Sequence, residues 1–190
     1  MSRQALITFV IAGLLACLFP VGLRAQKAAV GVNVLDYANL VTFDAYGDVA
    51  VGRYITLEGN LRYNPFEYRI GDDRHTARYR QFSASLGARW WPWHIFSGWW
   101  MSAKGRYQVY NIGGFSSPET REGERYGGGL GAGYTYMVNP HFNLEFGVGG
   151  WMGADKYVKY DCPTCGVKTD EGTKFFILPA DMLLGLVYVF

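Results

Sequence analysis

Few residues of this sequence have the types and the spacing that catalysis requires. His75 follows Asp72 and Asp73, and Ser116 and Ser117 lie in a later polar segment. A histidine held by a carboxylate can activate a serine nucleophile when the side chains meet. A lone histidine among acidic residues is more often a solvated surface group. We therefore expect no catalytic residues, and a lipid-modifying or proteolytic enzyme is the alternative.

Two cysteines, Cys162 and Cys165, are the only ones after residue 25. Zinc usually takes four protein ligands, and His75, His94 and His141 lie far away in the sequence. A redox pair needs a helix N-terminus that lowers a thiol pKa, and the surrounding sequence has no helical pattern. We predict a local disulfide, with no metal and no cofactor. Metal or redox chemistry is the alternative, and the sequence leaves the oxidation state open.

The first 25 residues have the layout of a secretory signal. Arg3 gives a positive start, an apolar run follows over 5–23, and Ala25 is a small residue at the expected cleavage point. We therefore predict a signal peptide over 1–25 and one domain over 26–190.

Two other interpretations of this leader compete with cleavage after Ala25. An uncleaved membrane anchor is disfavoured because Pro20 and Gly22 interrupt the apolar run. A lipoprotein cleavage box ending at Cys17 is disfavoured because apolar residues continue beyond that cysteine, although the sequence leaves its lipidation open.

The composition excludes several classes of protein. The 190 residues are 49% hydrophobic, 17% aromatic and 18% charged, so the chain is too apolar for a disordered protein. Removal of Arg3 and Arg24 with the leader lowers the basic residues from 18 to 16, which equals the 16 acidic residues. A nucleic-acid-binding protein would show a basic excess, so we expect no nucleic-acid partner.

Apolar and polar residues alternate along most of the remaining chain. Over 55–65, Ile55, Leu57, Leu61 and Tyr63 fall on one face and polar residues on the other, which is the period of a β-strand. The pattern predicts eight strands, near 27–36, 42–52, 55–66, 78–91, 99–111, 125–138, 142–156 and 174–190. The longer connections, 67–77, 112–124 and 157–173, all fall at one end if the strands run up and down. We expect an all-β fold, an eight-stranded antiparallel up-and-down barrel.

Aromatic residues gather near the predicted strand ends, which favours a transmembrane barrel over a soluble ligand-binding barrel. One band comprises Trp90, Trp91, Trp93, Phe96, Trp99, Trp100, Tyr136, Phe142, Tyr188 and Phe190, and the other Tyr63, Phe66, Tyr79, Tyr107, Tyr126 and Tyr157. The ending with Gly185, Tyr188 and Phe190 resembles the signal read by the outer-membrane barrel-assembly machinery, although Leu183 stands where a polar residue is expected. We expect a bacterial outer-membrane location with lipid around the barrel, periplasmic termini and extracellular long loops.

The polar face of such a barrel lines its interior. Eight strands enclose only enough space for side chains, and buried charges must be paired. We predict a filled lumen with a charge network of Glu58, Arg62, Arg89, Lys104, Arg106, Arg125 and Glu145, joined by Asp44 and Asp48. The glycines at 127, 129, 131 and 133 are expected to face the long Arg and Lys side chains.

Several segments resemble a family of small, uncharacterised outer-membrane barrels of Bacteroides-like bacteria, a domain of unknown function. They are Arg62 to Phe66, Ala88 to Trp91, Gly127 to Tyr134 and Cys162 to Gly166, together with the aromatic chain end. The family is often encoded near fimbrial genes, so the resemblance implies an envelope or fimbrial protein as a candidate partner, and no catalytic residues. We expect a non-enzymatic surface anchor or an accessory subunit of a larger outer-membrane assembly.

Overall fold

The computed structural model describes residues 28–69, 76–114, 119–161 and 167–190. Strands dominate these residues. They are β1 (Ala28–Asn33), β2 (Phe43–Ala50), β3 (Ile55–Asn64), β4 (Glu67–Arg69), β5 (Thr76–Trp90), β6 (Gly98–Gly113), β7 (Thr120–Met137), β8 (Phe142–Tyr160) and β9 (Lys168–Val189), with one short helix, α2 (Val34–Ala38).

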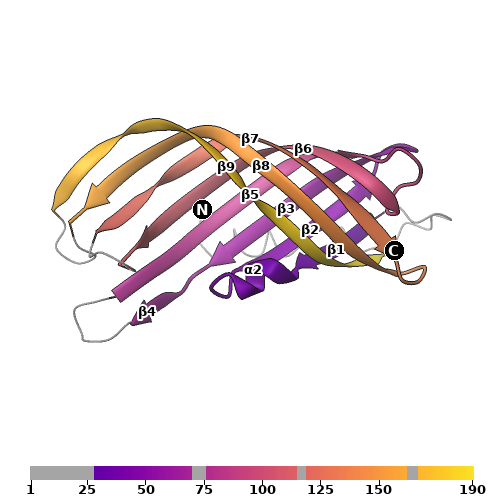
Figure 1. The fold of residues 1–190 in the computed structure, drawn as a ribbon, viewed down its shortest axis with the longest axis horizontal. Helices are drawn as coiled ribbons and strands as arrows, with labels where there is room; N and C mark the ends of the chain where they lie inside the picture. Colours follow the sequence, from indigo (N-terminus) through magenta and orange to yellow (C-terminus); the bar gives the residue numbers. More distant parts are fainter. Residues whose placement is uncertain (1–27, 70–75, 115–118, 162–166) are drawn as a thin grey trace, which may run out of the picture.

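Eight of the strands close into an antiparallel barrel (Figure 1). Each strand pairs with the next along the chain, except that β3 pairs with β5, and β1 pairs with β9 to complete the ring. The short strand β4 is an addition, paired to the loop-side end of β5. The prediction of an all-β, eight-stranded antiparallel up-and-down barrel is therefore confirmed, with one extra strand.

The strands extend further into the predicted connections than the sequence indicated. Pairs such as Arg121↔Lys159 and Lys159↔Asp170 continue the ladders of β7, β8 and β9. The predicted connections 112–124 and 157–173 are therefore partly wrong. Charge and glycine are typical of loops, but backbone pairing does not require apolar side chains.

The sequence predicts the first strand over 27–36, and this prediction is wrong at its end. Strand β1 ends at Asn33, and helix α2 begins at Val34. The Asn33 side chain accepts a hydrogen bond from the N–H of Leu35 at 3.2 Å and caps α2. The same side chain accepts from the N–H of Leu184 at 3.0 Å and donates to the carbonyl of Met182 at 2.9 Å. One asparagine therefore starts the helix and fastens it to β9. No helix among the described ranges has the length and apolarity to cross a membrane.

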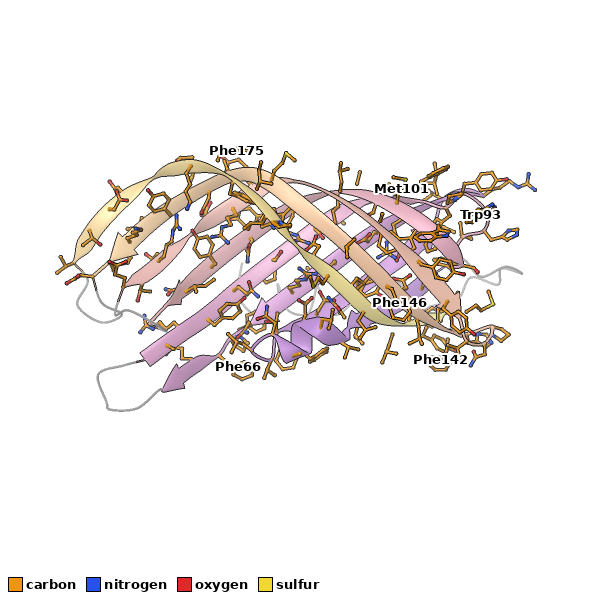
Figure 2. All side chains as sticks on the ribbon, viewed as in Figure 1. Phe66, Trp93, Met101, Phe142, Phe146 and Phe175 are labelled. Carbon is orange, nitrogen blue, oxygen red and sulfur yellow. The ribbon has the colours of Figure 1, made fainter. Side chains whose placement is uncertain are left out.

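The barrel is apolar outside and polar inside. Along β3, Ile55, Leu57 and Leu61 are exposed, whereas Thr56 and Glu58 are buried. Three exterior side chains are among the most exposed large hydrophobic residues that the structure describes: Leu86 at 76%, Leu130 at 68% and Val148 at 67%. Figure 2 shows Met101, Phe146 and Phe175 pointing away from the wall. The alternation thus places polar side chains in the interior, as the sequence predicted.

A β-bulge interrupts this alternation in β9. Gly149 pairs with Asp181 and Trp151 pairs with Leu178, so β9 has one residue more than β8 across this step. Asp181 on one side of the bulge and Phe176 on the other are consequently both buried. The β-bulge therefore explains why the apolar–polar alternation breaks around Pro179.

Candidate functional site: a layered charge network

The deepest layer of the interior is built around Arg89. This guanidinium is only 2% exposed. Its Nε donates to Glu58 Oε2 at 2.6 Å, and its Nη1 lies 3.0 Å from Glu145 Oε2 and 3.3 Å from Asp48 Oδ2. Strands β2, β3, β5 and β8 supply these four residues, so the network ties the wall together across the lumen.

Neutral side chains complete the hydrogen bonding of this layer. Tyr46 and Thr135 donate their hydroxyls to Glu145 at 2.9 and 3.1 Å. Thr56 donates to Asp48 at 3.1 Å and accepts from the Trp91 indole at 3.1 Å. The three carboxylates therefore face one arginine and a shell of donors, which suits buried charge.

Three aromatic residues close the short-turn end below this layer. Trp91, Phe96 and Trp100 are buried, and the Trp100 ring lies 4.5 Å from the Arg89 guanidinium carbon. The sequence predicts all three in an outer aromatic band, and for these residues that prediction is wrong. Their inward position follows for Trp100 from the strand period of β6, in which even-numbered residues face the lumen.

Glycines make room for Trp100. A Cβ atom at Gly147 would meet the Trp100 ring at 2.8 Å, and one at Gly133 would overlap it. The prediction that the glycine run faces Arg and Lys side chains is therefore wrong at Gly133, where an indole ring takes the space. The expectation of a charged side chain there follows from placing Trp100 in the outer aromatic band.

The middle layer is centred on Asp181. Arg106 donates to both of its carboxylate oxygens at 2.8 Å, and Arg62 Nη1 donates to Oδ1 at 3.2 Å. The Lys104 ammonium lies 3.5 Å from Asp181 Oδ2 and 3.5 Å from Glu58 Oε1. Lys104 thereby links the middle and deepest layers. A small cavity of about 30 Å³ lies between these groups.

Arg62 extends the middle layer to helix α2. Its Nε lies 2.7 Å from Asp44 Oδ2 and 3.0 Å from Asp36 Oδ2. Asp36 lies in the β1–β2 connection. Burial raises the pKa of Asp36 to about 6; Arg62 opposes this rise and the Asp44 carboxylate adds to it.

The upper layer, near the loop end, holds a separate cluster. Asp155 is fully buried and accepts a hydrogen bond from the Tyr110 hydroxyl at 2.6 Å. Arg125 Nε and Arg121 Nη2 lie 3.3 and 3.5 Å from its Oδ2 atom. No ion pair among the described residues joins this cluster to Asp181.

The predicted lumen residues all lie on the interior side of the wall. Glu58, Arg62, Arg89, Lys104, Arg106 and Glu145 are connected through the two lower layers, and Arg125 belongs to the upper one. Sequence reasoning missed Asp181, Asp155, Arg121 and Asp36. The strand period alone could have identified Asp155, whereas the bulge concealed Asp181 and a predicted connection concealed Arg121.

Of the predicted assembly residues, Gly185 and Tyr188 lie on opposite faces of β9, and Phe190 directly follows the strand. Gly185 faces inward, where a Cβ atom would overlap the Tyr46 hydroxyl. Tyr188 lies outside, with ring centroids 5.1 Å from Phe142 and 5.0 Å from Phe190. The Phe190 N–H donates to the Ala28 carbonyl at 2.9 Å.

Other predicted features lie outside the described residues. They are the leader 1–25, His75 with Asp72 and Asp73, Ser116, Ser117, Cys162 and Cys165. Within the described part, no group of three or more His, Cys, Asp and Glu side chains is arranged to hold a metal ion.

Comparison with known proteins identifies a family and no function. A family model described as "Protein of unknown function (DUF3575)" matches residues 9–190. A search of curated proteins gives no match.

Proposed function

Because the chain belongs to the DUF3575 family, whose function is unknown, we propose its role from geometry. It is a non-enzymatic bacterial outer-membrane barrel, acting as a surface anchor or as an accessory subunit of a larger outer-membrane assembly. Its termini are periplasmic and its longer connections are extracellular.

The observation that best supports this proposal is that the barrel has apolar side chains on its outer face and charged side chains in its interior. Leu86, Leu130 and Val148 belong to a broad exposed apolar surface, while the interior holds charge. Leaving a leucine side chain in water costs roughly 1.5–3 kcal/mol relative to burial, and this cost disappears in lipid. A soluble ligand-binding barrel would have the opposite arrangement, with an apolar interior.

Aromatic residues at both rims also support a membrane location. Trp93 and Phe142 lie near the short-turn end of the barrel, and Phe66 and Phe175 lie toward the loop end (Figure 2). Such residues are enriched where a membrane meets water. Trp90, Trp99 and Tyr136 are exposed members of the first band and continue it around the wall.

The packed interior favours an anchoring or docking role over transport. The Arg89 network and the buried Trp100 ring block the short-turn end. A small barrel without an aqueous channel offers its connections and its outer wall for contact with partners. An envelope or fimbrial protein is the partner class we propose.

The test is the location and mass of the native particle. A tag placed after Gln26 leaves β9 intact, and outer membranes are extracted with a mild uncharged detergent. We expect the protein in the outer-membrane fraction. A particle of one barrel with detergent supports the anchor, and a larger particle with other envelope proteins supports the subunit. Recovery from the soluble periplasmic fraction would contradict the proposal.

A further inference from the structure

The upper layer differs from the layers below it in how its arginines are used. Arg106 in the middle layer donates to both oxygens of Asp181 at 2.8 Å. Arg121 and Arg125 instead approach a single oxygen, Asp155 Oδ2, at 3.5 and 3.3 Å. Neither contact has hydrogen-bond geometry, and both Nε atoms as well as Oδ2 are buried without a hydrogen-bond partner among the described residues.

Aromatic rings hold these arginines in place. The Arg121 guanidinium carbon lies 4.2 Å from the Tyr157 ring centroid, and that of Arg125 lies 4.1 Å from the Tyr110 centroid. The Lys174 ammonium lies 5.6 Å from the centroid of Tyr157. A guanidinium group that stacks on an aromatic ring keeps its N–H donors in its own plane, pointing away from its centre, where they can bind an anion. The two cations are therefore positioned by packing, and few acceptors among the described residues use their N–H donors.

The same region carries an excess of positive charge. Among the described residues, its inward-facing cations are Arg121, Arg125, Lys159 and Lys174, and the carboxylates facing them are Asp155 and Asp170. The deepest layer has the opposite balance, with three carboxylates around Arg89. The arginine side chains remain 25% and 19% exposed, so an ion arriving from the loop end can reach them.

We propose that this mouth, formed by Arg121, Arg125 and Lys174 over Asp155, binds an anionic group, a phosphate or a carboxylate, of a solute that enters from the loop end. Each of the two preorganised guanidinium groups can donate two parallel N–H hydrogen bonds to a pair of oxygens of either anion. Gly123 lies between the arginines on β7, and a Cβ atom there would overlap the Lys156 carbonyl and lie 3.0 Å from the Tyr110 hydroxyl. This glycine lets Tyr110 approach Asp155 and keeps the space between the arginines open.

The experiment is calorimetric titration of the protein in uncharged detergent, at matched ionic strength with chloride as background. The probes are inorganic phosphate, glucuronate, glucose 6-phosphate and neutral glucose. We expect phosphate or glucuronate to bind and glucose not to bind. Tighter binding of glucose 6-phosphate than of phosphate would identify a phosphorylated sugar as the source of the anion, and equal binding would identify the free anion.

Substitutions separate a ligand site from a structural ion pair. Arg121→Gln or Arg125→Gln should weaken binding about tenfold, which is the loss of one charge-assisted hydrogen bond. Asp155→Asn should tighten binding because it removes a competing carboxylate while an oxygen remains for the Tyr110 hydroxyl. Arg80→Gln, at an exposed arginine on the outer face of β5, is the matched control and should leave binding unchanged.

The proposal fails if no anion binds above the chloride background, or if Arg80→Gln weakens binding as much as the mouth variants do. Weaker binding by Asp155→Asn in a folded protein also contradicts it. If Arg125→Gln does not fold, Lys174→Gln replaces it, because the Lys174 side chain is exposed and its residue pairs with Asp155 across β8 and β9. The titration uses the barrel in detergent and therefore does not depend on the cellular location proposed above.

Discussion

At the scale of single residues, the interior charges of this barrel differ in how completely they are compensated. Arg89 is surrounded by Asp48, Glu58 and Glu145, and each contact is 3.3 Å or shorter. Removing one partner of a buried ion pair leaves an uncompensated charge, which usually costs more than the pair contributes. The deepest layer should therefore be the most sensitive to substitution.

Arg89→Gln tests this expectation. Asp48 and Glu145 would lose their cation and Glu58 would keep only Lys104, so we expect the free energy of unfolding to fall by about 3–5 kcal/mol. Urea unfolding of the barrel reconstituted in lipid vesicles measures the change. The matched variant Arg80→Gln removes an exposed ion pair with Glu67 and should cost less than about 1 kcal/mol. Equal effects of the two variants would show that the Arg89 layer is not a stabilising centre.

Asp36 gives the barrel a pH-dependent contribution. Its pKa of about 6 in the folded protein lies above the ordinary value of 3.8, so the folded state binds a proton more tightly than the unfolded chain. The contribution of Asp36 to stability is therefore greatest below pH 4, falls as the pH rises toward 6, and is constant above. The difference in unfolding free energy between the native protein and Asp36→Asn should decline across that window. A difference independent of pH would contradict the raised pKa.

The inward or outward direction of most charged residues could be predicted from the sequence, whereas their partners could not. Glu58 and Arg89 follow from the strand period. The contact of Arg89 with Glu145 joins residues 56 positions apart, and it depends on the barrel diameter and on the space that Gly133 and Gly147 leave for Trp100. The alternation of apolar and polar residues predicts neither the barrel diameter nor the space left for Trp100.

At the scale of the elements, strand pairing continues where the side-chain pattern stops. The ladders of β7, β8 and β9 extend through charged segments because backbone hydrogen bonds hold them. The strand ends and helix α2 were therefore unpredictable from alternation. The bulge in β9 was visible only as an irregularity around Pro179.

Deleting Ala180 removes the extra residue of the bulge. The alternation of β9 between Lys168 and Leu178 would then reverse relative to Asp181, so that Phe175 faces the lumen and Phe176 faces outward. Phe176 would lose its contact with Trp151, whose ring centroid lies 4.6 Å away. We expect loss of the compact, heat-modifiable form on electrophoresis. Pro179→Ala keeps the residue count and should retain that form; loss in both variants would implicate Pro179 itself.

The residue that directly follows β9, Phe190, should matter for insertion. Phe190 closes the ring through its N–H bond to Ala28 and packs on Tyr188. Deletion of Phe190 should lower the amount in the outer membrane more than Cys165→Ser does, measured by immunoblot of fractionated cells. Equal losses would count against an assembly role for this end.

At the scale of the whole molecule, strand number, antiparallel order and interior polarity could be predicted because each follows from a repeating pattern. The unequal lengths of the strands in the barrel wall could not be predicted. Strands β1 and β2 have 6 and 8 residues, whereas β9 has 22, and α2 lies against the short side (Figure 1). Strand β1 is short because Asn33 ends it and caps helix α2. A single capping residue leaves no trace in the alternation of apolar and polar residues.

The measurement that tests the central claim most directly is the environment of the outer wall in lipid. Nitroxide labels at Leu86 and Val148, with Cys162 and Cys165 replaced by serine, report collisions with oxygen and with a water-soluble nickel complex. We predict high oxygen and low nickel accessibility at both positions, and the reverse at Glu171 near the loop end. Nickel accessibility at Leu86 and Val148 equal to that at Glu171 would place the apolar wall in water and contradict the account.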